Sequence, residues 1–160
     1  MKDKEILPTI TIKRIKEQVF IIQENLLQDT SRLIKIEISQ NLAFALEANL
    51  VDLTLRIYYH FPDDSDTILV DISVQNLFEI TDLKSFMTNG TEIKLPPMVI
   101  ASIVGLSISH TRALLAKNLF GTVLQDSLPA IVNSEEVARH FFPRMFEIAT
   151  TKPLLEGANL

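Results

Sequence analysis

The chain has 160 residues, a length typical of one domain, with 47% apolar residues and a net charge of −5 at pH 7. It has no cysteine, which excludes disulfides, thiol catalysis and thiolate metal ligands. The mild acidity and the scattered basic residues argue against a nucleic-acid-binding surface, because phosphate contacts require clustered lysine and arginine. A small domain has a large surface relative to its volume and cannot bury all of these apolar residues in its own core. The composition therefore predicts that some apolar surface lies in subunit contacts or in a binding groove.

The first half of the chain, about residues 8–80, predicts strands. Ile10 and Ile12 begin an alternating segment whose parity slips near residues 13–16, which indicates a β-bulge. A second alternating segment begins at Ile34. It either turns at residues 39–41 or continues to about residue 49, and the pattern leaves both possibilities open.

The next two strands are the most regular part of the sequence. Residues 51–61 and 68–80 alternate between apolar and polar side chains, so each strand is predicted to bury one face. Between them, Pro62 to Asp66 are residues typical of turns, which predicts a hairpin. Short links throughout lead us to expect a four-stranded antiparallel β-meander.

The pattern then changes to a loop and a helix. Residues 81–95 have no period and are long enough for a functional loop. Pro96 and Pro97 favour a helix start, and apolar residues at helical spacing predict a helix over about residues 96–120. Gly121 is a plausible residue to end it.

A second helix is predicted over about residues 133–148. Asn133 can cap its first turn, and Pro143 ends or kinks the helix after Phe142. Residues 150–160 form a short tail with a weak pattern. The prediction is a single α+β domain over residues 1–160, in which two helices pack on an antiparallel sheet.

Catalytic and metal-binding patterns are not found in the sequence. His60, His110 and His140 are isolated, so each is interpreted as a surface or capping histidine rather than a metal ligand. Asp63, Asp64 and Asp66 lack the spacing of a calcium loop, and no glycine-rich phosphate loop is present. We therefore expect a binding protein that has no catalytic residues, cofactor or metal, rather than an enzyme.

Aromatic and methionine side chains at the end of the last strand and in the following loop are the best candidates for a peptide-binding groove. Such side chains offer large, adaptable apolar contacts to varied partners. The predicted groove residues are Leu77, Phe78, Ile80, Phe86 and Met87.

The order of elements and several segments resemble the SecB family of protein-export chaperones. The first strand, with its Arg14-Ile15 step, is similar to the opening strand of that family. Leu95-Pro96-Pro97 is similar to the start of its first long helix. The other similar segments are residues 53–57, 68–72, 77–80 and 128–133.

The resemblance implies a bacterial, cytoplasmic, ATP-independent holdase that binds non-native preproteins for Sec-dependent export. It also implies a homotetramer built as a dimer of dimers, and contact with the SecA motor through acidic residues on the sheet face. Asp71 keeps one such acidic position, whereas the tail at residues 152–160 has no Cys or His for the zinc-linked contact of the family.

Two other functions stay open. SecB-like relatives also serve one dedicated partner, such as an antitoxin. A different class is a carrier that holds an apolar small molecule between sheet and helices. No apolar signal core follows residues 1–5, and the apolar run at residues 95–106 is broken by two prolines and too short to span a bilayer, so no membrane insertion is expected.

Overall fold

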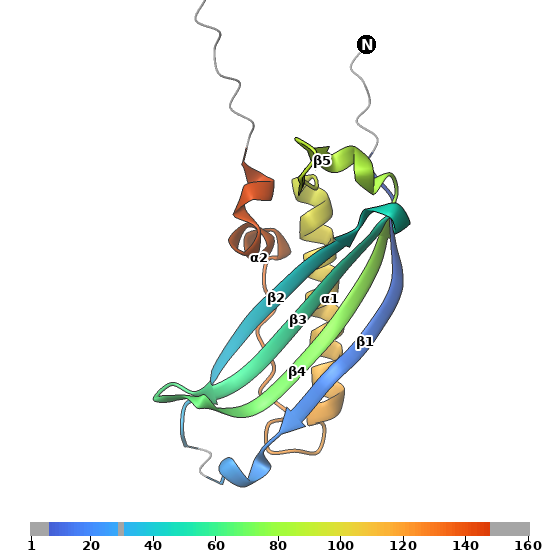
Figure 1. Ribbon diagram of the computed structural model, residues 1–160. Coiled ribbons are helices and arrows are strands. Elements are labelled where there is room, and N and C mark those ends of the chain that lie inside the picture. Colours follow the sequence, from blue (N-terminus) through green and yellow to red (C-terminus); the bar gives the residue numbers. More distant parts are fainter. Residues whose placement is uncertain (1–6, 29–30, 148–160) are drawn as a thin grey trace, which may run out of the picture.

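A computed structural model describes residues 7–28 and 31–147 of the chain; the expected tail at residues 150–160 lies outside them. A four-stranded antiparallel sheet and two helices make up most of the described structure (Figure 1). The strands are β1 (Ile10–Ile22), β2 (Lys35–Ala45), β3 (Leu50–Phe61) and β4 (Asp64–Ile80). The expected α+β class, with strands first and helices after, is confirmed.

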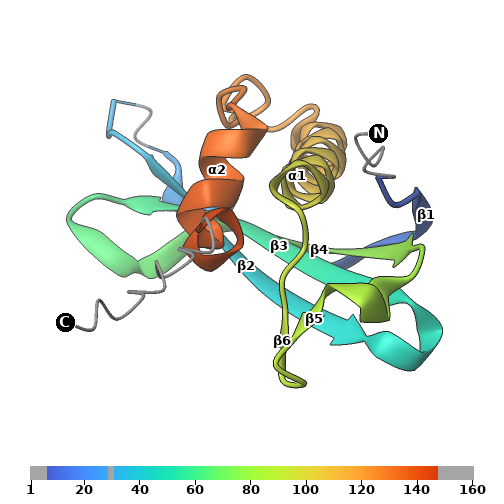
Figure 2. The ribbon, with the colours of Figure 1, turned by 90° about the horizontal axis from the view of Figure 1, so that it is seen from above.

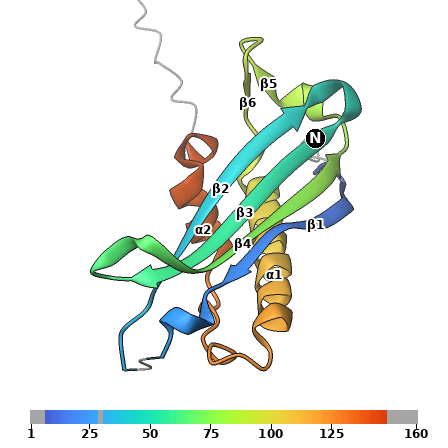
Figure 3. The same ribbon diagram turned by 60° about the horizontal axis from the view of Figure 1, so that its bottom comes forward.

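The strand order is β1-β4-β3-β2, so only β2, β3 and β4 form a meander. The expectation that β1 also follows this sequential order is wrong, because β1 pairs with β4 on the far side of the sheet. The described parts of the link, residues 23–28 and 31–34, lie beyond the ends of the inner strands, between the end of β1 and the start of β2 (Figure 3). Gln23 starts the link by donating its backbone N–H to the Leu69 carbonyl at 2.8 Å.

The structure confirms the irregularity predicted in the first strand and answers the question left open for the second. β1 shifts register between Ile12 and Arg14, as the parity slip predicts, and again between Glu17 and Val19. β2 pairs with β3 without interruption through residues 39–41, so the strand continues rather than turning there. A single 3-10 turn, η2 (Leu46–Ala48), then leads into β3.

Both helices lie on the same face of the sheet (Figure 2). They are α1 (Pro97–Leu119) and α2 (Ser134–Phe141). The regular alternation of β3 and β4 places their apolar side chains under α1, where they are buried. The central members of this core are Val51, Leu53, Leu55, Phe78, Ile80, Ile100, Ile103 and Val104. Gly121, with φ of 80°, adopts the left-handed conformation just beyond α1, as expected for a residue that ends a helix.

Within the described residues, α1 is the one helix long and apolar enough to cross a membrane, judged by length and composition. Its most apolar window has a mean hydropathy of 1.5, and 44% of that window is buried inside the protein. Packing against the sheet therefore accounts for one face of α1. The opposite face is exposed and also nearly free of charge, with Met98 and Leu106 among its exposed side chains.

The second helix and the loop before the first helix differ in detail from the sequence patterns. α2 is shorter than the predicted residues 133–148: it ends at Phe141, and a 3-10 turn, η4 (Pro143–Phe146), follows the proline. The Asn133 side chain accepts hydrogen bonds from the backbone N–H groups of Glu135 and Glu136, as expected of a cap.

The predicted loop at residues 81–95 contains its own small structure. It forms a 3-10 turn, η3 (Leu83–Phe86), and a short hairpin of β5 (Met87–Thr88) and β6 (Glu92–Ile93). Asn89 and Gly90 adopt positive φ at the tip, which suits those two residue types.

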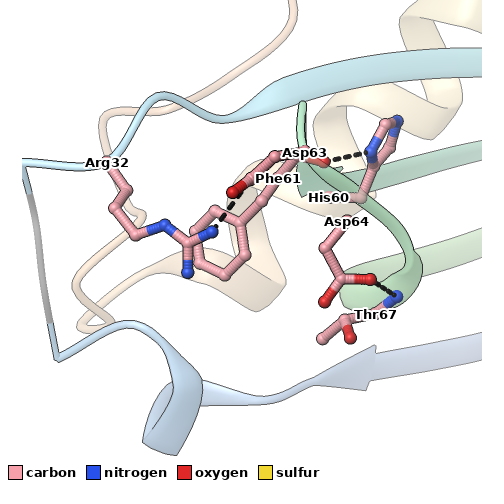
Figure 4. A network of polar contacts seen from close by, with 6 residues as sticks. All are labelled: Arg32, His60, Phe61, Asp63, Asp64 and Thr67. Atoms are coloured by element: carbon pink, nitrogen blue, oxygen red, sulfur yellow. Dashed lines mark hydrogen bonds and ion pairs between the residues drawn. The ribbon is translucent and has the colours of Figure 1, made fainter.

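The hairpin between β3 and β4 is tied to the link after β1 by polar contacts (Figure 4). The Arg32 guanidinium lies 3.6 Å from the centre of the Phe61 ring and forms a 2.9 Å ion pair with Asp63. Asp64 accepts a hydrogen bond from the Thr67 N–H, so Asp63 and Asp64 both have structural partners. His60 is 3% exposed and its Nδ1 lies 2.8 Å from the Phe61 carbonyl oxygen, so its interpretation as a surface histidine is wrong.

Candidate functional site: an apolar cleft beside an edge strand

The five predicted groove residues do not share one surface. Phe78 and Ile80 expose none of their area and belong to the core under α1, so the prediction that they line an open groove is wrong. They share the parity of the buried residues of β4, whereas Leu77 has the opposite parity and lies on the helix-free face of the sheet. Phe86 and Met87 are half-buried in η3 and β5.

A different set of apolar side chains forms a strip that is only partly covered. These side chains pack against the core cluster from the side of β2, α2 and the β5–β6 hairpin, and each keeps part of its surface exposed. We call this strip the β2–α2 cleft; its members are Ile38, Leu42, Phe44, Phe86, Ile93, Val137, Phe141, Phe142 and Phe146. Figures 1 and 3 show α2 beside β2.

Two surface hollows of about 320 Å³ each meet at Phe141 in this cleft. One lies between α2 and the edge of the sheet, where Val137 and Phe141 face Ile38. The other lies between β6 and the end of α2, where Ile93 faces Phe141 and Phe142. Because Phe141 borders both hollows, its ring is the apolar side chain that the two have in common.

Charged and polar side chains line parts of both hollows beside the apolar ones. Glu136 and His140, one helical turn apart on α2, border the first hollow and are exposed. At the second, Arg144 lies 3.8 Å from Glu92, and the Lys94 ammonium donates to the Glu147 carbonyl oxygen at 2.6 Å. Surfaces that bind another polypeptide usually combine apolar and polar side chains in this way.

β2 is the outermost strand on this side of the sheet, since the strand order places it last. An edge strand has a row of backbone N–H and C=O groups that point away from the sheet and can pair with an added strand. On its helix-facing side β2 presents Ile36, Ile38, Leu42 and Phe44, interrupted by Gln40. An extended peptide paired with β2 would place alternate side chains in the cleft.

The helix-free face of the sheet has a different chemistry, because its acidic groups are already bonded. Both oxygens of Asp71 accept hydrogen bonds from Arg56, at 2.8 and 2.9 Å, and this pairing raises the pKa of Arg56. Hydrogen bonds from Lys35 and then Tyr58 lower the pKa of Glu37 to about 2. Glu79 forms a 2.8 Å ion pair with Lys13. Asp71 is thus not a free acidic group on this face.

Sequence reasoning missed the cleft because it placed the groove at the end of the last strand and in the following loop. Phe141, Phe142 and Phe146 belong to short C-terminal elements, and no period separates a half-exposed aromatic from a buried one. A usable signal was present in α2, where Val137 and Phe141 are one turn apart on a helix otherwise rich in charged residues.

Comparison with known proteins gives the following results. No family model matches the sequence, and no curated protein matches it. Among solved structures, the chain is similar to the Mycobacterium tuberculosis SecB-like chaperone Rv1957, in complex with a ChAD peptide from the antitoxin HigA1. The identity is 11%, the TM-score is 0.48, and the match covers 77% of this chain and 87% of that one.

A protein of unknown function from Streptococcus agalactiae is also similar, at 9% identity and a TM-score of 0.30, over 73% of this chain and 95% of that one. TM-scores of this size do not establish a common fold family. The function is therefore inferred from the cleft itself.

Proposed function

We propose that this protein is a cytoplasmic, ATP-independent holdase chaperone that binds extended apolar segments of non-native polypeptides in the β2–α2 cleft. The observation that carries the proposal is the strip of half-buried apolar side chains beside the free edge of β2. Its role is binding without catalysis, and it uses no nucleotide.

Two kinds of contact would hold a client segment. Backbone groups of the client pair with the edge of β2, which requires no particular client sequence. Alternate client side chains cover Phe141 and its neighbours, which favours apolar and aromatic residues. Phe86, beside β5, stays part of the proposed site, and Met87 is proposed as a contact next to it.

We further propose that the chain assembles as a homotetramer. β1 is the other edge of the sheet, and four of its apolar side chains are 40–50% exposed: Ile12, Ile15, Val19 and Ile21. Exposed apolar residues along an edge strand can pair with another chain, and the exposed face of α1, which is nearly free of charge, offers a second contact. Native mass spectrometry at micromolar concentration tests this; a monomeric mass would refute it.

The chaperone could serve the export of many preproteins or a single dedicated partner. The helix-free face of the sheet supports the role with a single partner. Export in the SecB manner relies on acidic residues that contact the SecA motor, and Asp71 is held by Arg56. A chaperone dedicated to a single partner, such as an antitoxin, needs no such contact. We therefore favour a dedicated chaperone over a general export factor.

A carrier of an apolar small molecule is less well supported. That function requires a cavity between sheet and helices, yet fully buried side chains such as Leu55 and Ile103 fill this space. The described hollows of the β2–α2 cleft lie at the surface, where they suit a peptide better than an enclosed ligand.

Suppression of aggregation is the direct test. Several chemically unfolded proteins are diluted into buffer with and without the chaperone, in the absence of nucleotide, and light scattering is followed. Protection of all clients indicates a general holdase, and protection of one supports the dedicated role. No protection of any client, together with no binding of apolar peptides, would refute the proposed function.

A further inference from the structure

A further surface hollow lies away from the β2–α2 cleft, on the side of α1. Its volume is about 470 Å³, and it separates α1 from the chain that leads back to α2. Ile108, Arg112 and Ala116 of α1 line one side, and Leu128, Ile131 and Val132 line the other. Ser109 and Ser134 also border it, so it is a pocket of mixed polarity with one cationic side chain.

Arg112 differs from most arginines of the protein because it has no acidic partner among the described residues. The guanidinium groups of Arg32, Arg56, Arg139 and Arg144 each face a carboxylate. Arg112 instead donates through Nε to the Pro129 carbonyl oxygen at 2.8 Å, and its two terminal nitrogens have no partner in the described part of the chain. The chain has a net charge of −5, so acidic side chains outnumber basic ones, yet this guanidinium in a pocket has no carboxylate partner among the described residues.

The opposite wall of the pocket has backbone groups available for pairing. Residues 128–132 belong to no helix or strand, and no backbone hydrogen bond joins them to other residues of the described chain. Ile131 is 85% exposed and Val132 is 39% exposed. Apart from the Pro129 carbonyl, which Arg112 Nε occupies, the backbone groups of this segment have no partner within the described chain. A segment with such backbone groups and with exposed apolar side chains is suited to pair with an extended peptide.

We propose that this pocket binds an apolar client segment that carries an aspartate or glutamate, with the carboxylate held by the terminal nitrogens of Arg112. The fork of the guanidinium matches the two oxygens of a carboxylate, so Arg112 would favour acidic-apolar segments over purely apolar ones. Client side chains beside the acid would cover Ile131 and Val132. The inference rests on the proposed function, because it names the class of client segment that the chaperone prefers.

The test compares two labelled peptides that differ only by Glu against Gln, each with large apolar residues on both sides. Fluorescence anisotropy gives the Kd of each peptide for the full chain. We expect the Glu peptide to bind about fivefold more tightly to the wild type, as one partly exposed charge-assisted contact would give. In Arg112→Met, which keeps the apolar stem, this preference should disappear.

Two further variants serve as controls. Arg112→Lys keeps the charge but loses the fork, so a reduced preference for Glu should remain even if Arg112→Met folds poorly. Arg14→Met removes an arginine from the helix-free face, where Arg14 bonds to Gln75, and should leave the preference unchanged.

The possible results separate this inference from the proposed function. If both peptides bind the wild type equally, the inference fails and the holdase function stands; if neither binds, both fail. If Arg112→Met changes the oligomeric mass but not the preference, the pocket is a contact between copies and the inference is wrong. A small carboxylate ligand that co-purifies with the wild type and not with Arg112→Met would also overturn it.

Discussion

Replacing Phe141 with alanine is the sharpest perturbation of the β2–α2 cleft, because its ring borders both hollows. The ring is half-buried, so a bound client would cover on the order of 50 Å² of its remaining surface, from the size of an aromatic side chain. At about 25 cal/mol per Å², that area stabilises the complex by ~1 kcal/mol. A similar apolar area covered on the client brings the total to ~2 kcal/mol, which corresponds to a roughly 30-fold increase in Kd for Phe141→Ala.

The assay measures the Kd of an apolar peptide by fluorescence anisotropy for the wild type, Phe141→Ala and Phe120→Ala. Phe120→Ala makes the same chemical change at a side chain that is 84% exposed and lies just beyond the end of α1. We expect Phe120→Ala to bind as the wild type does. Urea denaturation checks that Phe141→Ala stays folded at the assay temperature. Equal affinity of the two variants for the peptide would refute the assignment of the cleft.

Three further predictions follow from the core and the packing of the helices. Phe78→Ala should lower the free energy of unfolding by about 3–5 kcal/mol in urea denaturation, the cost of removing a buried phenylalanine, because Phe78 is core and not groove. A change below ~1 kcal/mol would contradict that placement. Gly105→Val should weaken both stability and peptide binding, since a Cβ at Gly105 would lie 2.9 Å from the Ser134 Cβ and displace α2, whereas Ser102→Ala on the same helix should leave both nearly unchanged. Burial lowers the pKa of His110 below 6.5, so the unfolded chain binds more protons than the folded one. The free energy of unfolding should therefore fall as pH decreases from about 6.5 through the folded-state pKa, and this fall should be smaller in His110→Gln; identical pH profiles would contradict the prediction.

Local pattern was sufficient for the elements whose two faces differ strongly. β3 and β4 alternate so regularly that burial follows directly from sequence parity, and the bulge near residue 13 is visible as a slip in that parity. The cap at Asn133 and the stop at Gly121 also depend on neighbours in sequence alone. Each of these features is determined within a few residues, so no partner element had to be known.

The strand order and the candidate site could not be read in this way, because both depend on contacts between distant segments. The alternation of apolar and polar residues in β1 indicates that the strand has two different faces, but it does not indicate which strand β1 pairs with. Because β1 pairs with β4, β2 is left as a free edge of the sheet. Asn76 shows the same limit: it interrupts the buried row of β4, and only the packing of α1 places His110 Nδ1 2.8 Å from its amide oxygen.

The sequence by itself determined an apolar α+β domain, with four strands before two helices, and the residues that face its core. Strand parity and helical spacing depend only on residues close together in the sequence, so these two patterns were sufficient to predict the elements and their buried faces. Only the tertiary structure decided that Phe78 and Ile80 lie under α1 while Phe141 stays partly open, since the coverage of a side chain depends on which element lies over it. The same holds for Asp71 and Arg112: the fold gives one an arginine partner and leaves the other facing a pocket.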